Sequence, residues 1–103
     1  MTNPLPLVAE HHELIKTRDR CRVYKLSLAP GQSVNVSYSF FYLSVVLKGS
    51  KIKVSLGREP HSVTWEKHTM IGDEEWCSPV LDITIKNVGE ECYEQFIAEW
   101  TKS

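Results

Sequence analysis

The stretch NVSYSFFYLSVVLKGSKIKV, residues 35–54, decides the fold class because it is rich in β-branched and aromatic residues. No charge occurs in it before Lys48. Successive side chains of a β-strand point to opposite faces, so a strand from Ser37 to Leu47 has two mostly apolar faces. We therefore expect a central strand that is covered twice, once by the core and once by another sheet or another subunit.

The rest of the chain predicts further short strands separated by turns. In CRVYKLSL, residues 21–28, polar and apolar side chains alternate, and Pro30-Gly31 provides a turn that ends the strand. Similar patterns predict strands at KIKVSL (51–56), HSVTWEKH (61–68), VLDITIKN (80–87) and CYEQFIAEW (92–100). The segment GDEEWCSP (72–79) is expected to form turns. Together these elements predict an all-β sandwich or small barrel.

A helix competes with a strand only in the last of these segments. Phe96, Ile97 and Trp100 match a helical stripe as well as a strand pattern. We prefer the strand, because every other element is a short strand separated from the next by a turn.

Length and charge limit the possible classes of protein. The 103 residues fit one domain, 1–103, of which residues 1–12 look like an arm or an edge strand. Twelve basic and thirteen acidic residues give a net charge of −1, so nucleic-acid binding has no electrostatic basis. No run approaches the roughly 18 apolar residues of a membrane span, and we expect no membrane association. The start of the chain lacks a secretory leader pattern, which predicts a cytoplasmic protein or a mature chain whose leader was removed.

The three cysteines, Cys21, Cys77 and Cys92, are an odd number with wide spacing. This pattern fits neither a disulfide framework nor a paired zinc site, and we expect reduced, partly buried thiols. If one of them is a catalytic thiol, Cys77 is the strongest candidate because it lies in the turn-rich segment. No sequence neighbour supplies an obvious base for it.

Four pieces of the sequence resemble a small single-domain cupin, which is a jelly-roll barrel of two antiparallel sheets. The pieces are RDRCRVYKLSLAPGQ, VVLKGSKIKV, IGDEEWCSP and ITIKNVGEECYEQFIAEW, which together cover roughly residues 18 to 100. They look like the family's opening strand with a Leu-x-Pro-Gly turn, its Val-Leu-x-Gly strand end, its Gly-Asp-x-x-Trp turn and its Asn-Val-Gly turn. The resemblance implies an all-β fold, a cupin-type jelly roll of two antiparallel sheets.

Metal-binding cupins hold their metal with two motifs, G-x5-H-x-H-x3-4-E-x6-G and G-x5-P-x-G-x2-H-x3-N. The four ligand positions, counted forward from Gly31 and back from Asn87, are Ser37, Ser39, Leu43 and Ile83. Neutral hydroxyls are poor ligands for transition metals, and aliphatic side chains have no lone pair. The resemblance therefore implies a member of the family that binds no metal and uses no cofactor.

Within a jelly roll, the strand face that carries these positions would line a pocket. We predict that the pocket residues are Ser37, Ser39, Phe41, Leu43, Val45, Trp76 and Ile83. The opposite face of the same strand then needs a cover, which a second copy of the protein would supply. We predict a homodimer whose interface contains Tyr38, Phe40, Tyr42 and Val46.

Two classes of function fit this pocket. The first is a metal-free binding or scaffold module that holds a small, largely apolar molecule with one or two groups directed at the serines. If Phe41 and Trp76 fill the barrel, the protein would instead work only through its surfaces. A related possibility, which rests on the strand with two apolar faces, is a degenerate member of the family that assembles with a partner protein. The second class is a metal-independent enzyme of isomerase, lyase or cyclase type, with Cys77, Tyr42 or a histidine as acid or base. No residue at a ligand position is titratable, so we assign no catalytic residue.

Overall fold

The computed structural model describes residues 9–58 and 60–101, which form nine β-strands and contain no helix. The strands are β1 (His12–Arg18), β2 (Cys21–Leu28), β3 (Ser33–Tyr38), β4 (Tyr42–Lys48), β5 (Lys51–Leu56), β6 (Val63–His68), β7 (Glu74–Cys77), β8 (Val80–Asn87) and β9 (Tyr93–Trp100). Accordingly, these two ranges contain no helix that could span a membrane.

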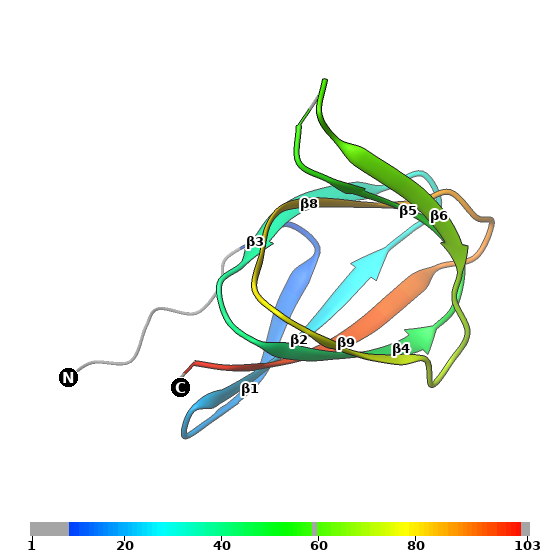
Figure 1. The fold of residues 1–103 in the computed structure, drawn as a ribbon. Helices are drawn as coiled ribbons and strands as arrows, with labels where there is room; N and C mark the ends of the chain where they lie inside the picture. The colour runs from blue at the N-terminus through cyan, green and yellow to red at the C-terminus, as the bar shows by residue number, and fades with distance from the viewer. Residues whose placement is uncertain (1–8, 59, 102–103) are drawn as a thin grey trace.

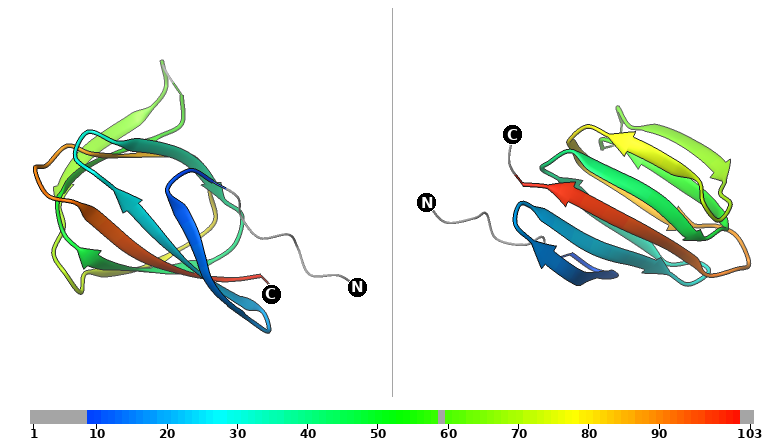
Figure 2. Two further views of the ribbon diagram at one scale, coloured as in Figure 1. Left: turned by 180° about the vertical axis from the view of Figure 1, so that it is seen from behind. Right: turned by 90° about the horizontal axis from the view of Figure 1, so that it is seen from below.

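The strands form two antiparallel sheets that face each other around the core (Figure 1). Sheet A has five strands in the order β1-β2-β9-β4-β7, and sheet B has four strands in the order β3-β8-β5-β6. Seen from behind and from below, the two sheets curve toward each other as the two layers of a barrel (Figure 2). The predicted all-β jelly roll is confirmed.

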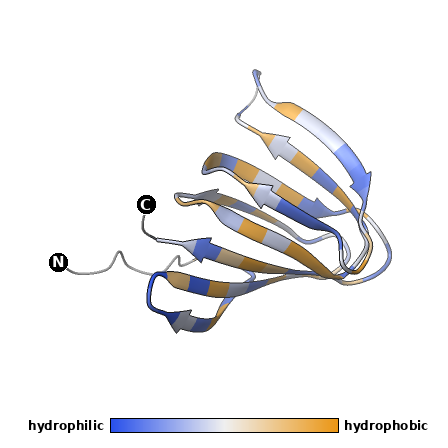
Figure 3. Cartoon of the chain, turned by 60° about the horizontal axis from the view of Figure 1, so that its bottom comes forward, coloured by the Kyte–Doolittle hydropathy of each residue, from blue (hydrophilic) through white to orange (hydrophobic). Residues whose placement is uncertain are grey.

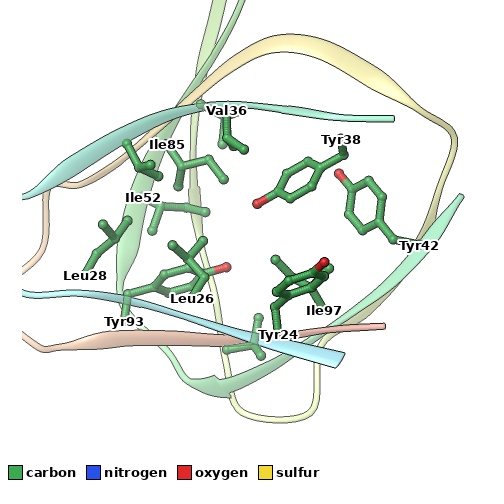
Figure 4. Packing of buried hydrophobic residues seen from close by; sticks show 13 residues of the cluster. Tyr24, Leu26, Leu28, Val36, Tyr38, Tyr42, Ile52, Ile85, Tyr93 and Ile97 are labelled. Atoms are coloured by element: carbon green, nitrogen blue, oxygen red, sulfur yellow. The ribbon is translucent and has the colours of Figure 1, made fainter. Parts of the chain in front are cut away.

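Alternation along each strand decides which side chains face the core. In β2, Tyr24, Leu26 and Leu28 are buried, while the residues between them are only partly covered. Ile52 and Val54 of β5 are buried in the same way. Figure 4 shows the core between the sheets, where tyrosines from four strands join the aliphatic side chains. The alternation predicted for residues 21–28 and 51–56 is confirmed.

The predicted continuous strand from Ser37 to Leu47 is wrong. β3 ends at Tyr38 in sheet B and β4 begins at Tyr42 in sheet A, so the chain crosses between the sheets through residues 39–41. The rings of Tyr38 and Tyr42 lie 4.7 Å apart at this crossing. The crossing contains no glycine or proline, which are the residues that usually mark such a break in a sequence.

The predicted orientation of this segment is reversed as well. Tyr38, Tyr42 and Val46 belong to the core, with exposed fractions of 2%, 7% and 6%. Phe40 lies in the crossing and is partly buried. These residues therefore do not form the free face that the predicted dimer interface requires. The tyrosine rings take the interior because they bury more apolar area than the serines beside them.

The edge strands of sheet A also differ from the prediction. The acidic segment expected to form turns contains β7, which pairs with β4. At the other edge, β1 begins at His12, where the predicted arm ends; residues 1–8 lie outside the described residues. β9 pairs with β2 on one side and β4 on the other, which confirms a strand and not a helix for the last segment.

The glycine of the Val-Leu-x-Gly piece is required by a close approach of two backbones. A Cβ atom on Gly49 would clash with the backbone carbonyl of Thr69, so no larger residue fits there. The segment after β6 is held at this point by Ser50, whose N–H donates to Thr69 Oγ1 at 2.9 Å. Thr69 Oγ1 in turn donates to the Ser50 carbonyl at 2.6 Å.

Asn87, which begins the Asn-Val-Gly piece, connects three turns from inside the protein. Its side chain is completely buried, and its hydrogen bonds are 2.7 to 3.0 Å long. The partners are the Ser50 hydroxyl, the Gly89 N–H and the carbonyl groups of Leu28 and Glu91. All of its donors and acceptors are thus satisfied, as a buried amide requires.

Candidate functional site in the barrel

A cavity of about 120 Å³ lies between the two sheets, on the side where β6 and β7 are the edge strands. Its aliphatic walls come from β4, β5 and β8, and the residues are Val46, Ile52, Val54, Ile83 and Ile85. An apolar cavity of about 150 Å³ in another protein holds benzene, so a molecule of about that size fits here.

Four polar side chains reach the cavity from β4 and β9: Tyr42, Ser44, Tyr93 and Gln95. The Tyr93 hydroxyl donates to Gln95 Oε1 at 2.7 Å. Ser44 points inward with Tyr42 and Val46, and its hydroxyl makes no hydrogen bond within the described part of the chain. Ser44 is therefore one polar group of this wall that is available to a ligand, and the Gln95 side-chain NH₂, which has no partner among the described residues either, is another.

The mouth of the cavity is charged. Lys67 Nζ on β6 lies 3.5 Å from Glu75 Oε2 on β7, and this ion pair bridges the edges of the two sheets. Asp73 and Glu74 also line the cavity. Asp73 is held in place by the backbone N–H of Met70, which donates to its carboxylate at 2.9 Å. Three carboxylates against one ammonium make the mouth unfavourable for an anion.

Tyr42 and Cys77 lie opposite each other on β4 and β7 and both line the cavity. Burial raises the pKa of Tyr42 far above its ordinary value. Burial also raises the pKa of the Cys77 thiol, against a smaller lowering by its hydrogen bond with Tyr42. The thiol donates to the Glu75 carbonyl at 3.7 Å. Both groups are protonated at neutral pH, so neither is prepared to act as a base or a nucleophile.

His12 and Tyr38 close the end of the barrel next to Tyr42. His12 Nδ1 lies 2.8 Å from the carbonyl oxygen of Glu10 and donates to it, because a carbonyl only accepts. Nε2 is then the acceptor for the Tyr38 hydroxyl at 2.5 Å. Burial lowers the pKa of His12 and raises the pKa of Tyr38, so both partners are neutral in this hydrogen bond.

The structure places the predicted pocket residues on the outside of the barrel, with one exception. Ile83 lines the cavity. The outward-facing residues are Ser37, Ser39, Phe41, Leu43, Val45 and Trp76. The prediction is wrong for Ser37, Leu43 and Val45 because the even-numbered residues of β3 and β4 face the core. Ser39 and Phe41 are exposed in the crossing, and Trp76 lies beside Leu43 on the outer side of β7. The serine that lines the cavity is Ser44, whereas the sequence pattern leads us to expect Ser37 and Ser39 in this role.

Ser37 has a structural role instead. Its hydroxyl oxygen accepts the backbone N–H of Asp82 at 3.0 Å, where the register between β3 and β8 is interrupted. Asp82 has a φ of 59°, and its carboxylate accepts from Asn35 Nδ2 at 2.8 Å and from Arg58 Nε at 2.7 Å. These contacts on the outer surface stabilise the bulge in β8.

The ligand positions of the first cupin motif come out differently when they are counted back from its last glycine, Gly49, and not forward from its first, Gly31. The motif's glutamate precedes its last glycine by seven residues, so Gly49 places this position at Tyr42 and the two histidine positions at Tyr38 and Val36. All three residues are buried in the core, and Val36 pairs with Ile83, the third histidine position. The segment between Gly31 and β3 is one residue shorter than the motif requires. Counting forward from Gly31 therefore places each ligand position of this motif one residue too far along the chain.

These four residues do not fit a metal ion. Val36 and Ile83 offer no lone pair, and Tyr38 and Tyr42 are neutral phenols. Across residues 9–58 and 60–101, no three His, Cys, Asp or Glu side chains are grouped so that they could hold a metal. The donor set that the cupin motifs imply therefore has no equivalent at this place in the barrel.

Two facing antiparallel sheets with an interior cavity define a cupin-type jelly roll, also called a double-stranded β-helix. Solved cupin structures confirm this fold. A cupin domain from Bordetella pertussis Tohama I matches with a TM-score of 0.75 and 16% identity, over 99% of this chain and 99% of that chain.

Two further structures support the same assignment. An RmlC-like cupin family protein from Methanocaldococcus jannaschii has a TM-score of 0.64 and 11% identity, over 95% of this chain and 93% of that chain. A conserved protein with a double-stranded β-helix domain from Klebsiella pneumoniae has a TM-score of 0.67 and 14% identity, over 87% of this chain and 75% of that chain. At these identities the likeness establishes the fold and no activity. No protein-family model and no curated protein sequence matches the chain.

Proposed function

We propose that this chain is a metal-free cupin-fold module that binds a small, largely apolar molecule in the cavity between its sheets. The observation that carries the proposal is Ser44, whose hydroxyl has no partner among the described residues and reaches a cavity that is also lined by aliphatic side chains of β5 and β8. A fully buried hydroxyl without a partner costs about 1–3 kcal/mol. Ser44 is half-buried, so a ligand that covers it must supply one hydrogen-bonding group to avoid this cost.

The cavity determines the size and polarity of the ligand. About 120 Å³ accommodates a molecule the size of phenol, and Val46, Ile52 and Val54 would contact its apolar part. One hydroxyl or carbonyl group would bind to Ser44. The carboxylates at the mouth favour a neutral or cationic molecule over an anionic one.

The proposal that the protein binds no metal rests on the four residues at the positions of the cupin metal ligands, which are Val36, Tyr38, Tyr42 and Ile83. It is tested separately by elemental analysis of the purified protein. We expect no stoichiometric transition metal, and one equivalent of iron, manganese, nickel or zinc would overturn this part of the proposal while leaving the cavity to be tested on its own.

A metal-independent enzyme of isomerase, lyase or cyclase type is the competing function. One observation favours it, because Tyr42 and Cys77 bring two titratable groups to the wall of the same cavity. Their raised pKa values count against it, since a general acid or base works best with a pKa near the working pH. We therefore favour binding without chemistry.

The direct test is a titration of ¹⁵N-labelled protein with phenol, followed by NMR. We expect saturable shifts of the backbone amides on β4, β5 and β8 around the cavity. Val46→Phe fills the cavity and should abolish binding, whereas Val45→Phe makes the same change on the outer side of the same strand and should retain it. Equal binding by both variants, or no shifts with the wild type, would exclude the cavity as the site.

Overpacking by Val46→Phe costs about 1–3 kcal/mol, so the fold of this variant must be verified by circular dichroism. Ser44→Leu is a second filling variant at a less buried position of the same wall. It should also lose phenol binding, and retained binding in a folded Ser44→Leu variant would contradict the proposal.

A further inference from the structure

Hydrophobic residues recur along the strands of sheet A (Figure 3), and some of them lie on the outer side of the sheet. Strand pairing arranges its apolar side chains in two rows, Val23, Ala98, Leu43 and Trp76 in the first and Phe96 and Val45 in the second. We call these six residues the outer apolar face. Of the six, Trp76 is 71% exposed, Val23, Leu43, Val45 and Phe96 are partly buried, and Ala98 is only 6% exposed. Apolar side chains that gather on one outer face often mark an interaction site.

The size of sheet A limits the interface that its outer face can form. Five strands span about 19 Å and strands of seven or eight residues are about 25 Å long, but β7 has only four residues. The sheet therefore measures less than roughly 480 Å² in projection, below the roughly 800 Å² of accessible surface that each partner buries in an interface of standard size.

The outer surface of sheet A carries one exposed tryptophan at the β7 edge and one depression toward the β1 edge, and Trp100 of β9 contacts both. At the β7 edge, Trp76 protrudes with 71% of its surface exposed, and it stacks on Trp100 at a centroid distance of 6.0 Å. At the β1 edge, a depression of about 460 Å³ lies beside the β1–β2 turn. Its lining residues are Lys16, Arg18, Asp19, Arg20, Cys21, Val23 and Trp100.

A two-fold axis parallel to β9 would bring this protrusion and this depression together. β9 is the middle strand of sheet A, so rotation about its direction superimposes the β1 edge of one copy on the β7 edge of the other. Lys16, Val23, Ala98, Leu43 and Trp76 occupy successive strands in one row. Lys16 then faces the partner's Trp76, Val23 faces the partner's Leu43, and Ala98 faces its own copy, where its small side chain permits close packing.

Charge favours the same axis. The β1 strand and its turn carry three basic residues, Lys16, Arg18 and Arg20, against two acidic ones, Glu13 and Asp19. The segment at the opposite edge carries three acidic residues, 73–75, of which Glu75 is paired with Lys67 at the cavity mouth and Glu74 lies opposite Val45 of the outer face. An axis across the strands would instead place the two basic edges together and the two acidic edges together, which costs interaction energy.

We propose that a second copy of this chain covers the outer apolar face of sheet A, through a two-fold axis parallel to β9. Trp76 enters the depression at the partner's β1 edge, where Lys16 contacts the indole face as a cation–π pair. The contact is isologous, so the same residues are used twice. This interface lies on the opposite side of sheet A from the cavity and does not depend on ligand binding.

Light scattering on a size-exclusion column tests the interface. We expect twice the chain mass at about 100 μM, and weakening of the dimer by at least about tenfold in Trp76→Arg or Phe96→Lys. Val63→Lys makes a comparable change at an exposed position on β6 in sheet B and should leave the dimer intact. A monomeric wild type, or a dimer that both Trp76→Arg and Phe96→Lys leave unchanged, would overturn the proposal.

A charge exchange tests the axis. Lys16→Glu and Trp76→Lys should each weaken the dimer, and the double variant should regain dimer stability, because positions 16 and 76 face each other across this axis. A dimer that is weakened by both single changes and weakened further by their combination would rule out this axis. Trp76 is exposed and Lys16 lies on an edge strand, so these variants are expected to fold.

Discussion

The ion pair between Lys67 and Glu75 joins the free edges of the two sheets across the mouth of the cavity. Its N–O distance is 3.5 Å, and the two side chains are 44% and 62% exposed. β6 and β7 belong to different sheets and form no strand pair with each other. An exposed ion pair contributes about 0–1 kcal/mol, so breaking this contact costs little and leaves the strand pairing of both sheets intact.

Removing this ion pair should speed up ligand exchange. Glu75→Gln is expected to raise both the association and dissociation rates of phenol, with little change in its affinity and less than about 0.5 kcal/mol in stability. NMR line shapes during the titration measure the rates. Glu66→Gln is the matched control because it removes the Lys51–Glu66 pair at 3.4 Å, away from the mouth. Equal acceleration in both variants would show that Glu75 does not control entry.

The two serines Ser44 and Ser37 should separate ligand binding from stability. Ser44→Ala removes the hydroxyl in the cavity and is expected to weaken phenol binding about fivefold to tenfold while leaving benzene binding unchanged. Ser37→Ala removes the acceptor of the Asp82 N–H, so it should cost about 1 kcal/mol of folding stability and keep phenol affinity. Urea unfolding and the NMR titration measure the two quantities. An unaltered preference of Ser44→Ala for phenol over benzene would count against Ser44 as the ligand's partner.

Asn87 should be among the least replaceable residues of the barrel. Asn87→Ala leaves the Ser50 hydroxyl, the Gly89 N–H and two carbonyl groups without their side-chain partner. Because each unsatisfied buried group costs about 1–3 kcal/mol, we expect a loss of at least about 3 kcal/mol in urea unfolding. Asn35→Ala is the control at an exposed asparagine and should cost about 1 kcal/mol or less. A loss below about 1 kcal/mol for Asn87→Ala would contradict this role.

Strand positions could be predicted from the sequence where one face of a strand is polar. In β5, lysines alternate with Ile52 and Val54, so the inward residues are evident from the pattern. In β4 both faces are apolar, and Val45 and Val46 are chemically identical, so local pattern cannot choose between them. The choice is made by long-range packing, in which the rings of Tyr38 and Tyr42 meet inside the barrel.

The cavity could be predicted only in part. Ile83 is found from its distance to Asn87, and Ser44 would be found with Tyr42 if the motif were counted back from Gly49. No motif in the sequence identifies the residues at the mouth of the cavity. Lys67 and Glu75 lie on different sheets and meet only because the barrel closes.

His12 should give the stability of the protein a pH dependence of definite sign. Burial lowers its pKa from 6.5, against a smaller raising effect of its hydrogen bond to the Glu10 carbonyl, and the nearby His11 lowers it further. The unfolded chain therefore binds a proton at a higher pH than the folded chain does. Stability from His12 is fully present above pH 6.5 and is lost as the pH falls through the lower pKa of the folded state.

We therefore expect the urea midpoint to fall between about pH 7 and about pH 5, and His12→Gln to reduce this fall. Glutamine keeps an acceptor for the Tyr38 hydroxyl but does not titrate, so this substitution removes the proton linkage without removing the hydrogen-bonding group. His68→Gln removes an exposed histidine on β6 and serves as the control, which should retain the wild-type dependence. A His12→Gln variant that loses stability on acidification as steeply as the wild type would place the titrating group elsewhere.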